Sequence, residues 1–104
     1  EDVGIFMKDL VVSVVDKMKD IDEIIQKFSE HWVLDRMTVI DRNILRMGTG
    51  ELLLNFPTPP RVVINEAIDI AKKYGNEDSP EFINGILDKI YKEIGQKGSL
   101  PFIT

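Results

Sequence analysis

The chain has 104 residues, no cysteine and a formal net charge of −5 at pH 7. This length accommodates one domain, and the missing cysteines exclude disulfides, thiolate metal ligands and cysteine nucleophiles. The acidic balance argues against a protein that binds nucleic acid unaided, although a local basic face is compatible with it.

The hydrophobic fraction of 43% is typical of a globular protein and too high for a disordered one. No apolar run approaches the roughly 18 residues of a membrane span. We therefore expect a cytoplasmic protein that does not enter a membrane.

Apolar residues recur with helical spacing almost throughout, which predicts an all-α bundle of about five helices. The first predicted helix carries an apolar residue at every fourth position, with two valines widening the stripe. These residues are Phe6, Leu10, Val14 and Met18, widened by Val11 and Val15.

Asp20 and Glu23 form a capping-box pattern that predicts the start of a second helix. A third helix is predicted from about Asp35 to Leu54, because Pro57 disfavours helical geometry in the residue before it. The second helix has the apolar face Ile21, Ile24, Ile25 and Phe28, and the third has Met37, Ile40, Ile44, Leu45, Gly48 and Leu52.

Thr58 and Pro59 predict the start of a fourth helix, which Gly75 ends. Ser79 and Pro80 repeat the start signal for a fifth helix, which is predicted to end at Gly95. The predicted buried face of the fourth helix is Val63, Ala67, Ile70, Ala71 and Tyr74; that of the fifth is Phe82, Ile83, Ile86, Leu87, Ile90 and Ile94.

Glycines and polar groups depart from this pattern at three places. The run Gly48-Thr49-Gly50 interrupts a helix, which indicates close helix packing or a kink and not a nucleotide loop. Gly85 costs a helix roughly 1 kcal/mol relative to alanine, so we expect another backbone to pass close to it. Residues 76–80 are equally compatible with partner contacts and with a capping role.

Nothing in the sequence predicts catalysis. His31 is the only histidine, and one histidine does not make the usual zinc site. The carboxylates fall on polar helix faces beside lysines and arginines, which is typical of a solvated surface. We expect no enzyme, no metal and no cofactor.

The stretch from Trp32 to Ile90 resembles the C-terminal part of the NusB family. Each short motif is weak alone, but together they follow in order and at family spacing over more than half of the chain. The matching segments are WVLDRM (32–37), IDRNILR (40–46), ELL (51–53), VINEAI (63–68), AKKYG (71–75), EDS (77–79) and FINGILD (82–88).

The resemblance implies one NusB-like helical domain over residues 1–104 that lacks the N-terminal helices of the family. Residues 1–33 would end an N-terminal subdomain, residues 34–95 would form a C-terminal subdomain, and residues 96–104 would be a tail. The family's Arg-rich N-terminal segment has no counterpart here, and Gly50 stands where the family commonly has an aromatic residue.

Proteins of this kind are transcription antitermination factors. They bind the boxA element of nascent ribosomal RNA together with NusE, a small-subunit ribosomal protein, within the antitermination complex on RNA polymerase. Carried over by the resemblance, the RNA or partner surface includes Asp41, Arg61, Asp78 and Phe82. Arg61 would contact a phosphate, Phe82 would stack on a base or pack in the core, and Asp78 would bond a base edge or the protein partner.

Two alternatives remain open from the sequence. One is the NusB-like RNA-binding domain of an rRNA cytosine methyltransferase, which would require a catalytic extension after Thr104. The other is a helical interaction module that forms a homodimer and buries the former RNA face.

Overall fold

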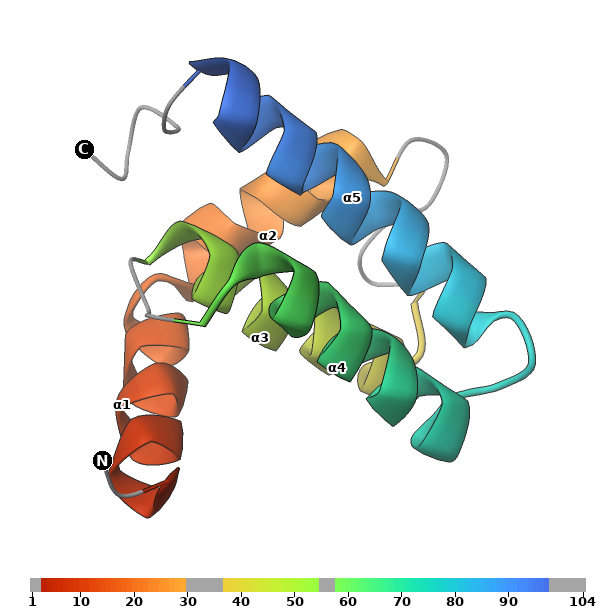
Figure 1. The fold of residues 1–104 in the computed structure, drawn as a ribbon, viewed down its shortest axis with the longest axis horizontal. Helices are drawn as coiled ribbons and strands as arrows, with labels where there is room; N and C mark the ends of the chain where they lie inside the picture. The colour runs from red at the N-terminus through yellow and green to blue at the C-terminus, as the bar shows by residue number, and fades with distance from the viewer. Residues whose placement is uncertain (1–2, 30–36, 55–57, 98–104) are drawn as a thin grey trace.

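The computed structural model describes residues 3–29, 37–54 and 58–97, and these form five α-helices (Figure 1). The helices are α1 (Val3–Asp16), α2 (Met18–Phe28), α3 (Val39–Leu53), α4 (Pro60–Tyr74) and α5 (Ser79–Lys97). The described residues contain no strand, so the predicted all-α class and the five helices are confirmed.

Helix α3 lies at the centre of the fold, because it contacts each of the other four helices. Helices α4 and α5 pack against α3 and against each other, and α2 packs on α3 and α5. Figure 1 shows that α3 and α5 run in one direction and that α4 runs in the opposite direction. Helix α1 extends away from these three helices. None of the helices in the described residues is both long and apolar enough to cross a membrane.

The buried core joins all five helices. Its largest fully buried side chains include Leu45 of α3 and Leu87 of α5. Burial of this apolar surface is the main stabilising contribution to the fold. The remaining core side chains are Leu10, Val14, Ile21, Ile24, Ile25, Met37, Ile44, Leu53, Val63, Ile64, Ala67, Ala71, Ile83, Ile86 and Ile90.

The start of α2 differs from the prediction. Helix α1 ends at Asp16, and α2 begins at Met18 after a single turn residue, Lys17. Asp20 therefore lies inside the first turn of α2, and the predicted capping box is wrong. No proline or glycine marks this break, and the apolar stripe continues across it in the sequence.

The predicted widening of the α1 stripe is also wrong. Leu10 and Val14 are buried, but Val11 and Val15 are 45% and 59% exposed. Since α1 extends away from the group, only one narrow side of the helix meets α3 (Figure 1).

Helix α3 begins later than predicted because Thr38 supplies its cap. The Asp41 backbone N–H donates a hydrogen bond to the Thr38 hydroxyl at 3.1 Å. The predicted start at Asp35 is outside the described residues, as are His31 and the predicted subdomain boundary after Val33.

The N-cap of α4 lies one residue later than predicted. Pro59 occupies the N-cap position, and Pro60 is the first helical residue, where its missing N–H is harmless. Gly75 ends the helix as predicted, with its N–H bonded to the Ala71 carbonyl at 2.9 Å. Tyr74 was predicted to be buried, but it is 62% exposed.

Two of the helical glycines lie close to side chains of other helices, whereas a third has no close neighbour. A Cβ on Gly48 would lie 3.0 Å from Leu87 Cδ1, and one on Gly50 would collide with the Val14 side chain, so close packing at this run is confirmed. At Gly85 a Cβ would meet nothing within 4 Å, and the predicted neighbouring backbone is wrong. Gly95 does not end α5, which continues to Lys97.

Candidate nucleic-acid and partner interface

The four residues carried over from the family do not lie together. Asp41, Asp78 and Phe82 lie where α3 begins, α4 ends and α5 begins, which we call the α5-start end of the molecule (Figure 1). Arg61 is exposed in the first turn of α4, at the opposite end of that helix. A helix of 15 residues separates the two ends by about 20 Å.

Asp41 is turned into the protein. Its side chain belongs to the first turn of α3 and is only 6% exposed. The positive end of the helix dipole favours a carboxylate there, although Asp41 Oδ1 accepts no hydrogen bond from the described residues. A direct contact of Asp41 with RNA or a protein partner stays a prediction, which would require this side chain to turn outward.

The turn before α5 is held by hydrogen bonds of its own. The Asn76 N–H donates to the Ser79 hydroxyl at 2.9 Å, and that hydroxyl donates to the Asn76 side-chain oxygen at 3.2 Å. The same oxygen accepts the Asp78 N–H at 2.9 Å. Ser79 is fully buried, so its role is to build the turn, whereas the exposed Asp78 carboxylate is left available for a contact.

Two roles were predicted for Phe82, stacking on a base and packing in the core, and its partial burial is compatible with both. It is half-buried and packs against the core, four residues before Ile86 on the same side of α5. The packing anchors the ring, and the Phe82 backbone N–H donates a hydrogen bond to the Asp78 carbonyl at 3.1 Å.

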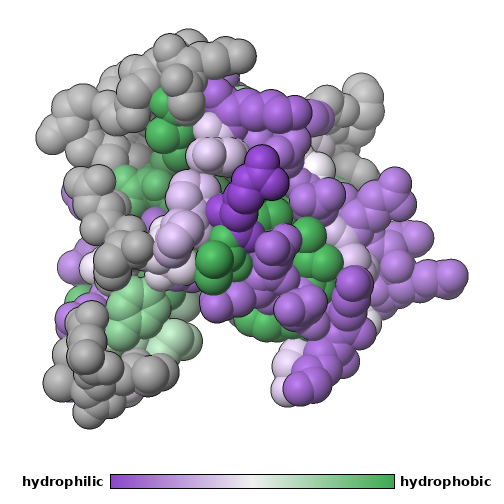
Figure 2. Space-filling model, viewed as in Figure 1, coloured by the Kyte–Doolittle hydropathy of each residue, from purple (hydrophilic) through white to green (hydrophobic). Residues whose placement is uncertain are grey.

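The sequence reasoning missed the exposed residues with which α4 ends. Lys72 and Lys73 occupy its last turn and are exposed, and Tyr74 follows directly. Residues 75–77 separate Tyr74 from Asp78, so the α5-start end combines two basic side chains and an exposed aromatic ring. Figure 2 shows this end as a predominantly hydrophilic surface. The signal was present in AKKYG, whose lysines fall outside the Val63–Ala67–Ala71 stripe.

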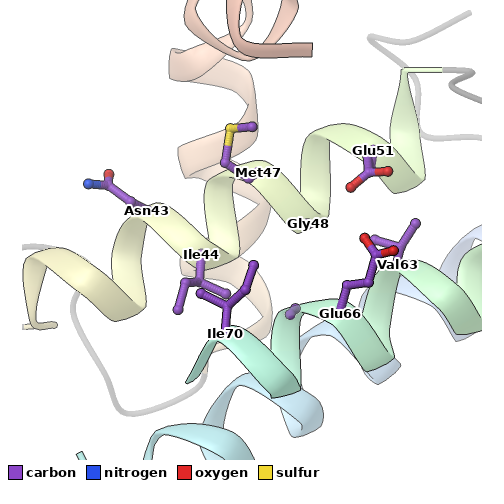
Figure 3. A pocket seen from close by; sticks show the side chains of 9 residues that line it. Asn43, Ile44, Met47, Gly48, Glu51, Val63, Glu66 and Ile70 are labelled. Atoms are coloured by element: carbon purple, nitrogen blue, oxygen red, sulfur yellow. The ribbon is translucent and has the colours of Figure 1, made fainter. Parts of the chain in front are cut away.

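A separate groove of about 230 Å³ lies between α3 and α4 (Figure 3). Glu51 of α3 and Glu66 of α4 point toward one another across it. Burial raises the pKa of the Glu51 carboxyl above its ordinary value of 4.5; a hydrogen bond from the Thr58 side chain opposes the rise, and the charge of Glu66 adds to it. The sequence places Glu51 and Glu66 in two separate family segments, ELL and VINEAI, and does not pair them.

Comparisons with known proteins agree with this fold. The profile of the NusB family matches residues 1–92. A protein from Chloroherpeton thalassium named transcription antitermination protein NusB is 44% identical over 95 residues, which are 91% of this chain and 45% of that protein. A protein of the same name from Geobacter sulfurreducens is 48% identical over 93 residues, which are 89% of this chain and 67% of that protein.

A solved structure described as T. maritima NusB is similar in fold, with a TM-score of 0.78 and 46% sequence identity. The match covers 82% of this chain and 60% of that one. The chain thus spans about half to two thirds of the length of the proteins that it matches.

Proposed function

The chain belongs to the NusB family, and on that premise we propose that it is a transcription antitermination factor. In this proposal it binds the boxA element of nascent ribosomal RNA together with NusE and joins the antitermination complex on RNA polymerase. It acts as an adaptor that presents binding surfaces and catalyses no reaction.

The observation that supports RNA binding most directly is the arrangement at the α5-start end. Lys72 and Lys73 are exposed beside Tyr74, and the turn after them presents Asp78. Lysines neutralise phosphates, an exposed aromatic ring stacks on an unpaired base, and a carboxylate accepts from a base amino group. These are the elements with which proteins recognise single-stranded RNA.

Arg61 extends the proposal to the opposite end of α4. A strand that contacts both Arg61 and Lys73 must run along the length of α4, about 20 Å. We propose that Arg61 contacts a phosphate there, so its removal weakens RNA binding independently of the α5-start end.

The net negative charge of the chain is the reason to include a basic partner protein in the proposal. With a net charge of −5, the chain repels RNA outside its few basic patches. A basic partner such as a ribosomal protein adds the positive charge that the chain lacks. We therefore expect RNA affinity to rise when NusE is present.

The experiment is a titration of labelled boxA RNA and a scrambled RNA by fluorescence anisotropy, with and without NusE, at two salt concentrations. We expect selective binding to boxA that strengthens with NusE and weakens as salt rises, because phosphate contacts release counterions. Equal affinity for boxA and the scrambled RNA under all conditions would contradict the proposal.

Variants then map the surface. Tyr74→Ala should weaken boxA binding about tenfold, within the range for loss of one stacked base. Lys73→Ala and Arg61→Ala should each reduce the slope of log affinity against log salt by about 0.7 to 1. Lys8→Ala, on the distant and exposed α1 face, is the matched control and should change neither quantity.

One observation favours a second candidate, self-association. Met7, Val11, Val12 and Val15 are all exposed on α1 and form an apolar face that the described residues do not cover. Exposed faces of this kind are typical of protein interfaces. Mass measurement in solution, with and without RNA, distinguishes a homodimer from the monomeric adaptor.

A further inference from the structure

We propose that the turn between α4 and α5 selects an unpaired guanine, with the Asn76 amide bonded to the guanine O6 and the Asp78 carboxylate bonded to its N1–H and N2–H groups. This inference rests on the proposed RNA-binding function. It adds a specificity-determining residue, Asn76, and the identity of one base. Figure 1 shows the turn as the loop that joins the end of α4 to the start of α5.

The Asn76 amide is oriented by its oxygen. Asn76 Oδ1 accepts the Asp78 backbone N–H at 2.9 Å and the Ser79 hydroxyl at 3.2 Å. A flipped amide would turn its NH2 group against the Asp78 N–H, donor against donor. The NH2 group is therefore directed away from this N–H, and it has no hydrogen-bond partner among the described residues. Because Asn76 is exposed, its two N–H donors are accessible to a ligand.

Ser79 and Gly75 hold the turn in this conformation. Ser79 is fully buried, and its hydroxyl accepts the Asn76 backbone N–H at 2.9 Å. A Cβ on Gly75 would lie 2.5 Å from the Ser79 Oγ, so the missing side chain of Gly75 allows this hydroxyl to approach. The Asn76 amide is thus held beside the Asp78 backbone before RNA binds, which lowers the entropic cost of binding.

Guanine is the base whose edge matches these two groups. A carboxylate only accepts hydrogen bonds, and its two oxygens can accept two parallel ones. The Watson–Crick edge of guanine offers two neighbouring donors, N1–H and N2–H, and the acceptor O6 beside them. Adenine and cytosine each offer one amino donor on this edge, and uracil offers one N–H between two acceptors.

The charges around the turn favour the approach of a base edge. Glu77 and Asp78 are exposed carboxylates that repel phosphates. Lys72 and Lys73, in the last turn of α4, attract phosphates instead. Tyr74 lies between the lysines and the turn in the sequence and is 62% exposed, so its ring offers a face for stacking.

Pentanucleotides test the proposal on the intact chain at neutral pH and low salt. Each has one central nucleoside between two pairs of uridines: guanosine, inosine, adenosine, cytidine or uridine. Affinities are measured by NMR titration, and the side-chain NH2 resonance of Asn76 reports the base contact, which a purely structural Asn76 would not make. We expect the guanosine pentanucleotide to bind at least about fivefold more tightly than the inosine one, which lacks only the N2 amino group.

Protein variants separate the contacts. Asn76→Asp keeps the acceptor for Asp78 and Ser79 but removes the NH2 donors, so it should abolish most of the preference for guanosine over adenosine. Asn84→Asp, on the exposed face of α5, adds the same charge and is the matched control that should keep the preference. Asp78→Asn should abolish the preference for guanosine over inosine. Tyr74→Ala should weaken all five pentanucleotides by a similar factor, because stacking tolerates any base. Unchanged circular dichroism shows that each variant is folded.

Three results would overturn the proposal. They are equal binding of the guanosine and inosine pentanucleotides, an Asn76 NH2 resonance that does not shift with guanosine, and a guanosine preference that survives in Asn76→Asp. If the chain still prefers boxA to scrambled RNA, any of these results leaves the antitermination proposal standing. Absence of binding to every RNA, boxA included, would overturn both proposals.

Discussion

Alanine substitution at three helical glycines should have three different effects on stability. In a helix interior, alanine is more favourable than glycine by about 1 kcal/mol. At Gly85 the added Cβ meets nothing within 4 Å, so Gly85→Ala should keep the whole gain. We expect its free energy of unfolding to rise by about 1 kcal/mol.

At Gly50 the same change should destabilise the protein. The new Cβ would collide with Val14, a buried and stiff side chain of α1, so α1 must shift on α3. Overpacking of this kind costs about 1–3 kcal/mol, which leaves a net loss of about 1 kcal/mol after the helix gain. At Gly48 the Cβ would lie 3.0 Å and 3.2 Å from the two Leu87 methyl groups, so cost and gain should nearly cancel.

Urea unfolding followed by circular dichroism measures all three variants. A change of 1 kcal/mol should also shift the melting temperature by about 4–8 °C in a domain of this size. Val14→Ala should be less harmful in the Gly50→Ala background than in the wild type, because it removes the collision. The reasoning fails if Gly85→Ala destabilises the chain or if Gly50→Ala stabilises it.

Two further predictions concern charged groups. Arg46 of α3 holds Asp22 of α2 with two short contacts, Nε–Oδ1 at 2.8 Å and Nη2–Oδ2 at 2.9 Å. Asp22→Asn should therefore lower the free energy of unfolding by about 1–2 kcal/mol in urea titrations, and no loss would show that the pair is merely a surface contact. Glu51→Gln should be at least as stable as wild type at pH 7, because the amide carries no charge to desolvate or to repel Glu66. The raised pKa means that the folded state holds the proton more tightly than the unfolded one, so wild-type stability falls as pH rises from 4.5 through the raised value. The difference in free energy of unfolding between the Glu51→Gln variant and the wild type should disappear below pH 4.5. A difference that grows below this pH would contradict the prediction.

The fold could be predicted largely because its helices are amphipathic. The stripe of Ile21, Ile24 and Ile25 predicted a buried face, and the structure confirms it. The position of the break at Lys17 could not be predicted, since no glycine or proline marks it. Gly85 misled the prediction because a glycine in a helix has the same sequence signal whether or not another backbone is near.

The candidate site depended more on tertiary structure. Helical spacing alone places Arg61 and Asp78 at different ends of α4, but the family resemblance grouped them in one surface. Glu51 and Glu66 face one another because of the way α3 and α4 pack. Neither of the segments ELL and VINEAI indicates this packing. Tyr74 was assigned to the core because it continues the apolar stripe, yet α4 ends there and leaves the ring exposed.

The most direct test of the central claim is the mass of the complex that the chain forms with NusE and boxA RNA, measured by analytical ultracentrifugation. The account predicts one species that contains all three components with boxA RNA, and less of it with the scrambled RNA. A chain that sediments alone, or only with further copies of itself, in the presence of both would contradict the adaptor function.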